Sequence, residues 1–255
     1  MTNQQRTDLI EQHIREHKYA DLHSLAKRFH GSLSTVRRAL DSLENRGVVR
    51  RHHGGASLIE TDALVQEYDF LLRIHHEADR KFAIATLIAG QVPPGTTVIF
   101  DGGSTTFAVA RLLVRKRIRV ITNSLPVATL FGEVGNCETI VTGGDTLGRL
   151  GLLVGPLCEA SLAQIRADLA ILGGTGITES GVWNHHALVI AAQRRMIAAA
   201  ERTVFALDAS KFGRKALSLT TPFGPRLTVV TDTQPAPAVA DAIAAAGARL
   251  TLAPP

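Results

Sequence analysis

A run of two glycines and three hydroxyl residues in this sequence has the composition of an anion-binding loop. The run Asp101-Gly102-Gly103-Ser104-Thr105-Thr106 follows an apolar stretch, Thr97–Phe100, and opens a helical pattern that extends to about Leu113. Glycines let backbone N–H groups approach an anion, hydroxyls add donors, and a helix N-terminus carries positive potential. The run therefore predicts a phosphate cradle. The alternative is a tight strand-to-helix turn in which Ser104 caps the helix.

Four further small, polar segments follow apolar runs and extend this prediction. They are Thr122-Asn123-Ser124, Thr142-Gly143-Gly144-Asp145, Gly173-Gly174-Thr175-Gly176 and Asp208-Ala209-Ser210-Lys211. Open α/β sheets bind ligands at the carboxyl ends of their parallel strands, so these segments should converge, and Lys211 is the cation suited to a phosphate. The predicted ligand-binding residues are Asp101, Gly103, Ser104, Thr105, Thr106, Asn123, Ser124, Gly143, Gly144, Gly174 and Lys211.

A second group of residues has the chemistry of DNA recognition. From Lys27 to Ala56 the sequence has seven Lys or Arg and two acidic residues, so this segment alone has a net charge of 7 − 2 = +5, equal to that of the whole chain. An isolated Arg-Arg pair would be typical of an ordinary solvated helix, but this local charge favours a polyanionic partner. The predicted DNA-binding residues are Ser32, Ser34, Thr35, Arg37, Arg38, Arg50, Arg51 and His53.

Three short helices and a hairpin are expected to position these basic residues. The first helix covers Gln4–His17 with Leu9, Ile10 and Ile14 on its inner face, the second runs from the cap Asp21 through Phe29, and the third runs from the cap Ser32 to the stop at Gly47. A strand over Val48–Arg51 and a turn at His53-Gly54-Gly55 follow. This order predicts a winged helix-turn-helix over residues 1–57, whose third helix enters the major groove.

The rest of the chain reads as a linker and an α/β domain. Residues 58–75 show no clear period and are assigned to the linker, and residues 76–255 form the second domain. The expected strands are Thr97–Phe100, Arg119–Thr122, Glu138–Val141, Leu169–Leu172, Thr203–Ala206, Leu227–Thr231 and Arg249–Leu252. Because helical segments alternate with these strands, the predicted fold is α/β with a mainly parallel sheet.

The composition excludes several other classes of protein. A hydrophobic fraction of 45% with 20% charged residues can bury a core, which excludes a disordered chain or a fibre. The sequence has no apolar run near the ~20 residues of a membrane span and no secretory leader, so a cytoplasmic protein is expected. Cys137 and Cys158 are too few for a disulfide framework, and the adjacent histidine pairs lack ligand spacing, so we predict no metal and no cofactor.

The order of these motifs along nearly the whole chain is similar to that of a known family. The motifs are Ser32-Leu33-Ser34-Thr35-Val36-Arg37-Arg38-Ala39-Leu40, Arg51-His52-His53-Gly54-Gly55-Ala56, Phe70, Arg73, Lys81, the 101–106 run, Thr122-Asn123, Gly143-Gly144 and Ser210-Lys211-Phe212-Gly213. They resemble the DeoR family of bacterial transcriptional repressors. The resemblance implies a sugar-phosphate-sensing domain related to ribose-5-phosphate isomerase and glucosamine-6-phosphate deaminase folds. It also implies operator binding as a homodimer or homotetramer, and release from DNA by a phosphorylated sugar or polyol.

Three positions depart from the family's usual pattern. Ala39 stands where the family usually has Asp, so a brace for an arginine is either missing or replaced by Asp41. Val189 and Gln193 lie where the family often shows a Glu and a Lys. Because these two residues differ, the ligand contacts that the family makes from this helix cannot simply be assigned to this sequence. The difference also argues against isomerase chemistry, which would require a carboxylate there.

These features predict a DNA-binding transcriptional regulator, not an enzyme, that represses sugar or polyol catabolism until a phosphorylated sugar releases it. Two alternatives remain open at this stage. One is a sugar-phosphate isomerase or deaminase with a DNA-binding head, which would turn over its substrate through Asp101. The other is a regulator that binds a nucleotide or acyl-CoA on the same sheet.

Overall fold

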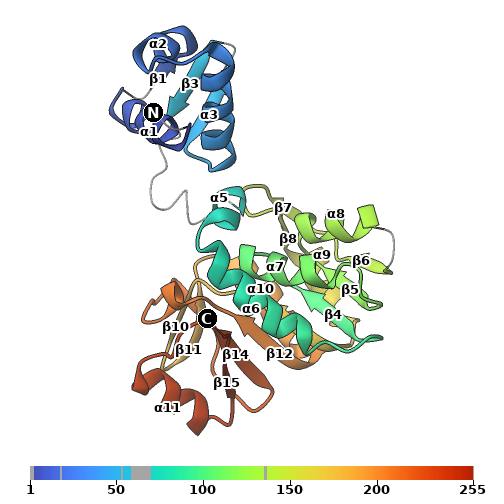
Figure 1. Ribbon diagram of the computed structural model, residues 1–255. Helices are drawn as coiled ribbons and strands as arrows, with labels where there is room; N and C mark the ends of the chain where they lie inside the picture. The colour runs from blue at the N-terminus through green and yellow to red at the C-terminus, as the bar shows by residue number, and fades with distance from the viewer. Residues whose placement is uncertain (1–2, 18, 53, 59–69, 135–136, 255) are drawn as a thin grey trace. The chain divides into compact units, whose positions relative to one another are not determined.

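The computed structural model describes residues 3–17, 19–52, 54–58, 70–134 and 137–254. The chain forms two compact units, Met1–His75 and His76–Pro255 (Figure 1). Every helix among the described residues is too short or too polar to cross a bilayer. Of the predicted linker, residues 59–69 lie outside the described residues, and the last six residues form the helix α5 (Phe70–His75). The division into residues 1–57 and a linker 58–75 stays a prediction.

The first unit is a winged helix-turn-helix, as predicted. Its elements are α1 (Asn3–His17), β1 (Tyr19–Asp21), α2 (Leu22–Arg28), α3 (Leu33–Asn45), β2 (Val49–His52) and β3 (Gly55–Leu58), with strand order β1-β3-β2. Ile10 and Ile14 of α1 pack with Val36 and Leu40 of α3 in one apolar core. Leu9 was wrongly expected on the inner face and is 42% exposed. The helix turns by about 100° per residue, so the arc that buries Ile10 and Ile14 leaves Leu9 toward solvent.

Side-chain caps define where two of these helices begin. The Asp21 carboxylate accepts hydrogen bonds from the backbone N–H groups of His23 and Ser24, and Ser32 Oγ accepts one from Thr35 N–H. Both residues have extended backbone, as N-caps do. The helix-turn-helix geometry is thus set by two short polar side chains that the sequence already identified.

Replacing the cap of α3 should loosen the helix that is predicted to contact DNA. Ser32→Ala should reduce the local stability of α3 by about 1 kcal/mol, because the first turn loses its side-chain acceptor. Amide hydrogen exchange of α3 in the full chain measures this change. Ser42→Ala, an exposed change within the same helix, is the control and should leave protection nearly unchanged. Equal protection in Ser32→Ala and the parent would contradict the capping role.

The second unit is built on a seven-stranded, fully parallel sheet. The strand order is β15-β14-β12-β9-β4-β5-β6, and every neighbouring pair is parallel. The strands are β4 (Thr97–Phe100), β5 (Arg119–Thr122), β6 (Thr139–Val141), β9 (Ala167–Leu172), β12 (Ala200–Ala206), β14 (Leu227–Thr231) and β15 (Arg249–Leu252). All seven predicted strands are therefore present, and the predicted fold class is confirmed.

Helices cover both faces of this sheet (Figure 1). On one face lie α6 (Ala78–Gly90), α7 (Ser104–Leu113) and α8 (Leu125–Val134), and on the other lie α9 (Pro156–Ala163), α10 (Ala187–Ala199) and α11 (Pro237–Ala245). Along β4, Val98 and Phe100 join the first core and Ile99 the second. This alternation follows from the two-residue period of a strand. The polar residues follow the strands, at the carboxyl edge of the sheet.

Five short strands that the sequence analysis did not predict lie outside the main sheet. A hairpin joins β7 (Asp145–Leu147) to β8 (Leu152–Val154), and a three-stranded sheet is formed by β10 (Gly176–Thr178), β11 (Gly181–Asn184) and β13 (Ser218–Thr221). Each has only three or four residues, which is too short for a hydrophobic period to show. Both small sheets begin close to the carboxyl ends of the parallel strands and therefore border the candidate ligand site.

Candidate DNA-binding and effector-binding sites

The outer face of α3 carries the residues predicted to contact DNA. Ser34, Arg37 and Arg38 are exposed, whereas Val36 and Leu40 are buried on the opposite face. Among the described residues, no acidic side chain forms an ion pair with Arg37 or Arg38. Both guanidinium groups, each with five N–H donors, are therefore available to phosphates and to base edges.

Three hydroxyl groups gather at the N-terminus of α3. Ser32 Oγ lies 2.8 Å from both Ser34 Oγ and Thr35 Oγ1 and 3.2 Å from Thr35 N. This is the positive end of the helix dipole, where an anion is stabilised. Ser32 acts as the cap, and the other two hydroxyls lie at a position suited to a DNA phosphate.

The wing is fastened to α3 by two acidic residues. Arg51 Nη1 donates to Asp41 Oδ1, and Arg51 N donates to Glu44 Oε1 at 2.9 Å. Ala39 is 6% exposed within the core, and Asp41, two positions further on, pairs with the wing residue Arg51. His53, predicted to contact DNA, lies outside the described residues, and the structure describes Arg50 only as part of β2.

At the carboxyl ends of the sheet, Asp101 is the centre of a buried polar network. Asp101 is 2% exposed, and its Oδ2 accepts hydrogen bonds from Gln193 Nε2 at 2.6 Å and from Gly173 N at 3.4 Å. Gln193 Nε2 also donates to Gly173 O, and its Oε1 accepts from Asn184 Nδ2 and Thr220 Oγ1. The network joins the ends of β4 and β9 to α10, β11 and β13. It holds the residues after β4 in a fixed position.

Three buried polar atoms beside this network make no hydrogen bond with any described residue. They are Ser104 Oγ, Thr106 Oγ1 and Asn123 Oδ1, and their side chains are 4%, 0% and 0% exposed. The alternative in which Ser104 caps α7 is wrong, because Gly103 occupies the N-cap with φ of 110° and no side-chain cap forms. Burying an unsatisfied polar group costs about 1–3 kcal/mol, so these three atoms are the candidates to receive a ligand's polar groups.

Two cations and a buried carboxylate lie near the end of β12. Asp208 is 1% exposed and caps the 3₁₀ turn η1 (Ala209–Lys211) by accepting from Ser210 N–H. Burial disfavours the ionised form of this carboxyl, but the Ser210 donors, Lys211 and Lys81 outweigh burial and lower its pKa below the ordinary value. Lys81 is only 6% exposed, and its Nζ donates to His76 O. Lys81 thus adds a second cation to this end of the sheet.

Removing the charge of Asp208 should destabilise the second unit in a pH-dependent way. Because the folded-state pKa is lowered, the ionised group stabilises the fold above the ordinary carboxyl pKa, and this stabilisation is lost as pH falls through the folded value. Asp208→Asn should therefore lower the free energy of unfolding by about 1 kcal/mol or more at neutral pH, and the difference should vanish in acid. Chemical denaturation followed by fluorescence of the single tryptophan, Trp183, measures this. The exposed Asp241→Asn is the control, and an equal loss at both pH values would contradict the account.

The predicted glycines have different environments. A side chain at Gly144, where φ is 119°, would place its Cβ 2.4 Å from Val154 O, and one at Gly174 would place it 2.7 Å from Val182 Cγ1. Gly143 is exposed and has no neighbour within 4 Å of such an atom. Gly144 and Gly174 therefore allow close packing at the border of the site. Of the remaining predicted residues, Thr105 is buried at the start of α7, and Ser124 Oγ accepts from the backbone of α8.

The hairpin β7–β8 lies over the strand ends. A Cβ on Gly102 would be 2.2 Å from Leu152 Cδ2, Asn123 Nδ2 donates to Leu153 O, and Ser124 forms an isolated bridge with Leu152. Leu152 and Val154 pack with Val189 of α10 in a small apolar cluster. The hairpin therefore covers Asn123 and the chain at Gly102, and a hydrogen bond that a ligand makes at such a buried position is stronger than one in water.

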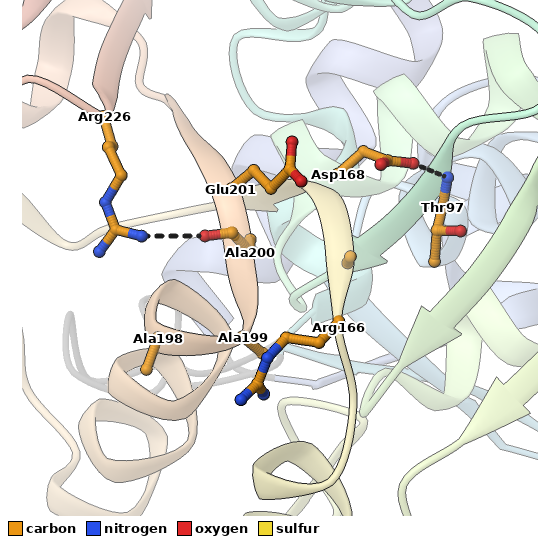
Figure 2. A pocket seen from close by; sticks show the side chains of 9 residues that line it. Thr97, Arg166, Asp168, Ala198, Ala199, Ala200, Glu201 and Arg226 are labelled. Carbon is orange, nitrogen blue, oxygen red and sulfur yellow. Dashed lines mark hydrogen bonds between the residues drawn. The ribbon is translucent and has the colours of Figure 1, made fainter.

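A cavity lies at the opposite, amino-terminal edge of the sheet (Figure 2). Its volume is about 330 Å³, and it is lined by Thr97, Arg166, Ala167, Asp168, Ala198, Ala199, Ala200, Glu201 and Arg226. Two acidic and two basic side chains face it, so their formal charges cancel. Arg226 Nη1 donates to Ala200 O, and Asp168 Oδ2 accepts from Thr97 N, as Figure 2 shows. Because its charges cancel, this cavity is less suited to a phosphate than the carboxyl edge of the sheet, where Lys81 and Lys211 lie near the end of β12.

Comparison with protein families identifies both units. The DeoR-like helix-turn-helix domain matches residues 6–62, and the DeoR C terminal sensor domain matches residues 76–233. This chain belongs to the DeoR family. The predicted resemblance is thereby confirmed. The DeoR chain is a DNA-binding transcriptional regulator rather than an enzyme, as the sequence analysis expected.

Several relatives of similar sequence carry the names of operon or regulon regulators. The glycerol-3-phosphate regulon repressor of Escherichia coli strain K12 is 31% identical over 85% of this chain and 86% of its own length. The L-fucose operon activator of Haemophilus influenzae is 30% identical over 83% and 85%, and a putative aga operon transcriptional repressor of Escherichia coli O157:H7 is 32% identical over 84% and 80%. Among solved structures, a ribose 5-phosphate isomerase A of Methanocaldococcus jannaschii aligns over 53% of this chain and 54% of its own at 16% identity, with a TM-score of 0.40.

Sequence reasoning missed two residues of the effector side of this DeoR chain. Gln193 was noticed only as a departure from the family pattern, yet it bonds to Asp101 and Gly173. Lys81 is one of the family motifs, but its helix precedes β4 in the chain, and only the fold brings it close to Asp208. A lone Lys within an otherwise apolar helical face was the available signal.

Proposed function

We propose that this DeoR-family chain represses operons for sugar or polyol catabolism in the cytoplasm and is released from its operator by a phosphorylated sugar or polyol. It acts as a homodimer or homotetramer, so that two α3 helices meet two half-sites. Of the three relatives described above, two are named as repressors and one as an activator. The three names refer to glycerol 3-phosphate, to fucose and to the aga operon.

One observation carries the effector assignment. Ser104 Oγ and Thr106 Oγ1 lie at the start of α7, where the helix dipole favours an anion, and Asn123 Oδ1 lies just after β5; all three are buried and accept or donate no hydrogen bond within the described part of the chain. The two hydroxyls can donate to phosphate oxygens, whereas the amide oxygen accepts only and therefore suits a hydroxyl of the ligand. A ligand with both a phosphate and free hydroxyls satisfies all three atoms.

The positive charges of Lys81 and Lys211 also support a phosphorylated ligand. Both lower the pKa of Asp208 by their electrostatic attraction, so both lie near this carboxylate at the end of β12. Since β12 is next to β9 and β9 is next to β4, this positive charge borders the strand ends that carry the three unsatisfied atoms. A dianionic phosphate is the group that such a border stabilises.

Operator release in the presence of small molecules tests this function. The full chain is bound to fluorescent duplexes that carry the DNA upstream of its own gene and of neighbouring genes, and anisotropy is followed. Glycerol 3-phosphate, ribose 5-phosphate, fructose 1-phosphate, the same compounds without phosphate, inorganic phosphate and AMP are added in turn. Release by a phosphorylated sugar or polyol, but not by its unphosphorylated parent, is expected. Release by AMP alone, or by none of these compounds, would overturn the effector assignment.

A further inference from the structure

The last turn of α1 brings together three side chains that bind transition metals. His13, Glu16 and His17 are spaced i, i+3 and i+4, so they lie on one face of the helix. One ligand atom from each of the three lies within 4.8 Å of those of the other two. The prediction of no metal covers the adjacent histidine pairs and sets of His, Cys and Asp, whereas this set includes a glutamate.

We propose that the DNA-binding unit holds one divalent transition-metal ion between His13, Glu16 and His17. Two imidazoles and one carboxylate are a donor set typical of zinc sites that keep a fourth position open, and nitrogen donors favour Zn²⁺, Ni²⁺, Co²⁺ or Cu²⁺ over Mg²⁺ and Ca²⁺. Glu16 and His17 are exposed, so an ion can reach them from solvent.

Existing hydrogen bonds already orient two of the ligands. His17 Nδ1 lies 2.9 Å from His13 O, and because a carbonyl only accepts, Nδ1 must carry the proton and the lone pair must be on Nε2. Glu16 Oε1 accepts from Gln12 Nε2 at 3.0 Å, which leaves its other oxygen for an ion. Bonds of this kind, from a ligand to a carbonyl or amide behind it, are the usual support of metal-binding side chains.

The third ligand, His13, is half-buried and packs against Phe29 of the helix-turn-helix. His13 Nδ1 is buried and makes no hydrogen bond with any described residue. Its ring meets Phe29 edge-on, with centroids 5.8 Å apart. Phe29 caps the C-terminus of α2 just before the turn into α3, so an ion that fixes His13 also supports this turn.

Metal binding to the untagged full chain tests the inference. After removal of metal by chelation and dialysis, the chain is titrated with CoCl₂ and followed by visible absorption, and with ZnCl₂ by calorimetry. One tight ion per chain is expected, together with a higher melting temperature of the first unit. His17→Ala and Glu16→Gln change exposed residues and should each weaken binding by about tenfold or more. His23→Ala, an exposed histidine on α2, is the matched control and should bind as the parent does.

Two results would overturn the site. One is the absence of stoichiometric binding to the parent chain. The other is unchanged affinity in His17→Ala, which would place the ion on other histidines. Circular dichroism and operator binding of the metal-free variants, which should match the parent, confirm that a loss of metal is not a loss of fold. Neither readout depends on the effector proposed above.

Discussion

Replacing Arg37 and Arg38 together with alanine should lower the affinity for operator DNA by about 100-fold or more, and each single change by about tenfold. A good arginine contact to a base edge contributes about 1–3 kcal/mol, and each phosphate contact also contributes through counterion release. Both side chains are exposed on α3 opposite its buried face, and Arg51, in contrast, is already paired with Asp41. Fluorescence anisotropy at physiological salt measures the change.

The salt dependence and a scrambled duplex separate the roles of the two arginines. If an arginine contacts phosphate only, its loss should weaken binding to both duplexes and reduce the slope of log affinity against log salt by about 0.9. If it reads a base, its loss should weaken binding to the operator alone. Arg111→Ala, an exposed change on α7 in the second unit, is the control. Operator binding of the double variant equal to that of the parent would show that α3 is not the recognition helix.

Thr106→Val should raise the concentration of sugar phosphate needed for operator release by about tenfold or more. Valine keeps the shape of threonine but cannot donate, and a hydrogen bond to a charged group contributes about 1.5–3 kcal/mol. Because Thr106 Oγ1 has no partner among the described residues, the same change should leave the free energy of unfolding unchanged or raise it. A hydroxyl that costs stability but supports ligand binding is the expected mark of a functional site.

Calorimetry of sugar-phosphate binding and denaturation of the same variants check both parts of this prediction. Ser104→Ala should act in the same direction, and the two changes together should exceed either one. Arg226→Ala alters the cavity at the opposite edge of the sheet and should leave effector affinity unchanged. If Arg226→Ala abolishes binding while Thr106→Val does not, the effector binds at the amino-terminal edge.

The sequence predicted the main sheet well because its strands are short apolar runs bounded by small residues. β4, β5, β14 and β15 have the predicted bounds, whereas β12 begins at Ala200, three residues earlier than expected. Its first residues, Ala200 and Glu201, have low strand preference, and pairing with β9 places them in the sheet. Tertiary contacts with β9 therefore determine where β12 begins, because the local sequence pattern there is weak.

The candidate sites were predictable where the chemistry is local and not where it depends on the fold. The Ser32 cap and the exposed arginines follow from helical spacing within one segment. The position of the β7–β8 hairpin over the strand ends could not be predicted from the sequence. Leu152 lies fifty residues beyond Gly102, and the two come into contact only in the folded sheet. The contact of Gln193 with Asp101 likewise joins residues 92 positions apart.

In the function that we propose, DNA and a sugar phosphate bind different units of one chain and oppose each other. Linkage requires that the factor by which the effector weakens operator binding equals the factor by which operator weakens effector binding. The direct test is calorimetric titration of the full chain with the releasing sugar phosphate, in the presence and absence of saturating operator duplex. We predict weaker effector binding in the presence of operator, by the factor seen in anisotropy. Equal effector affinity in both titrations would contradict the claim.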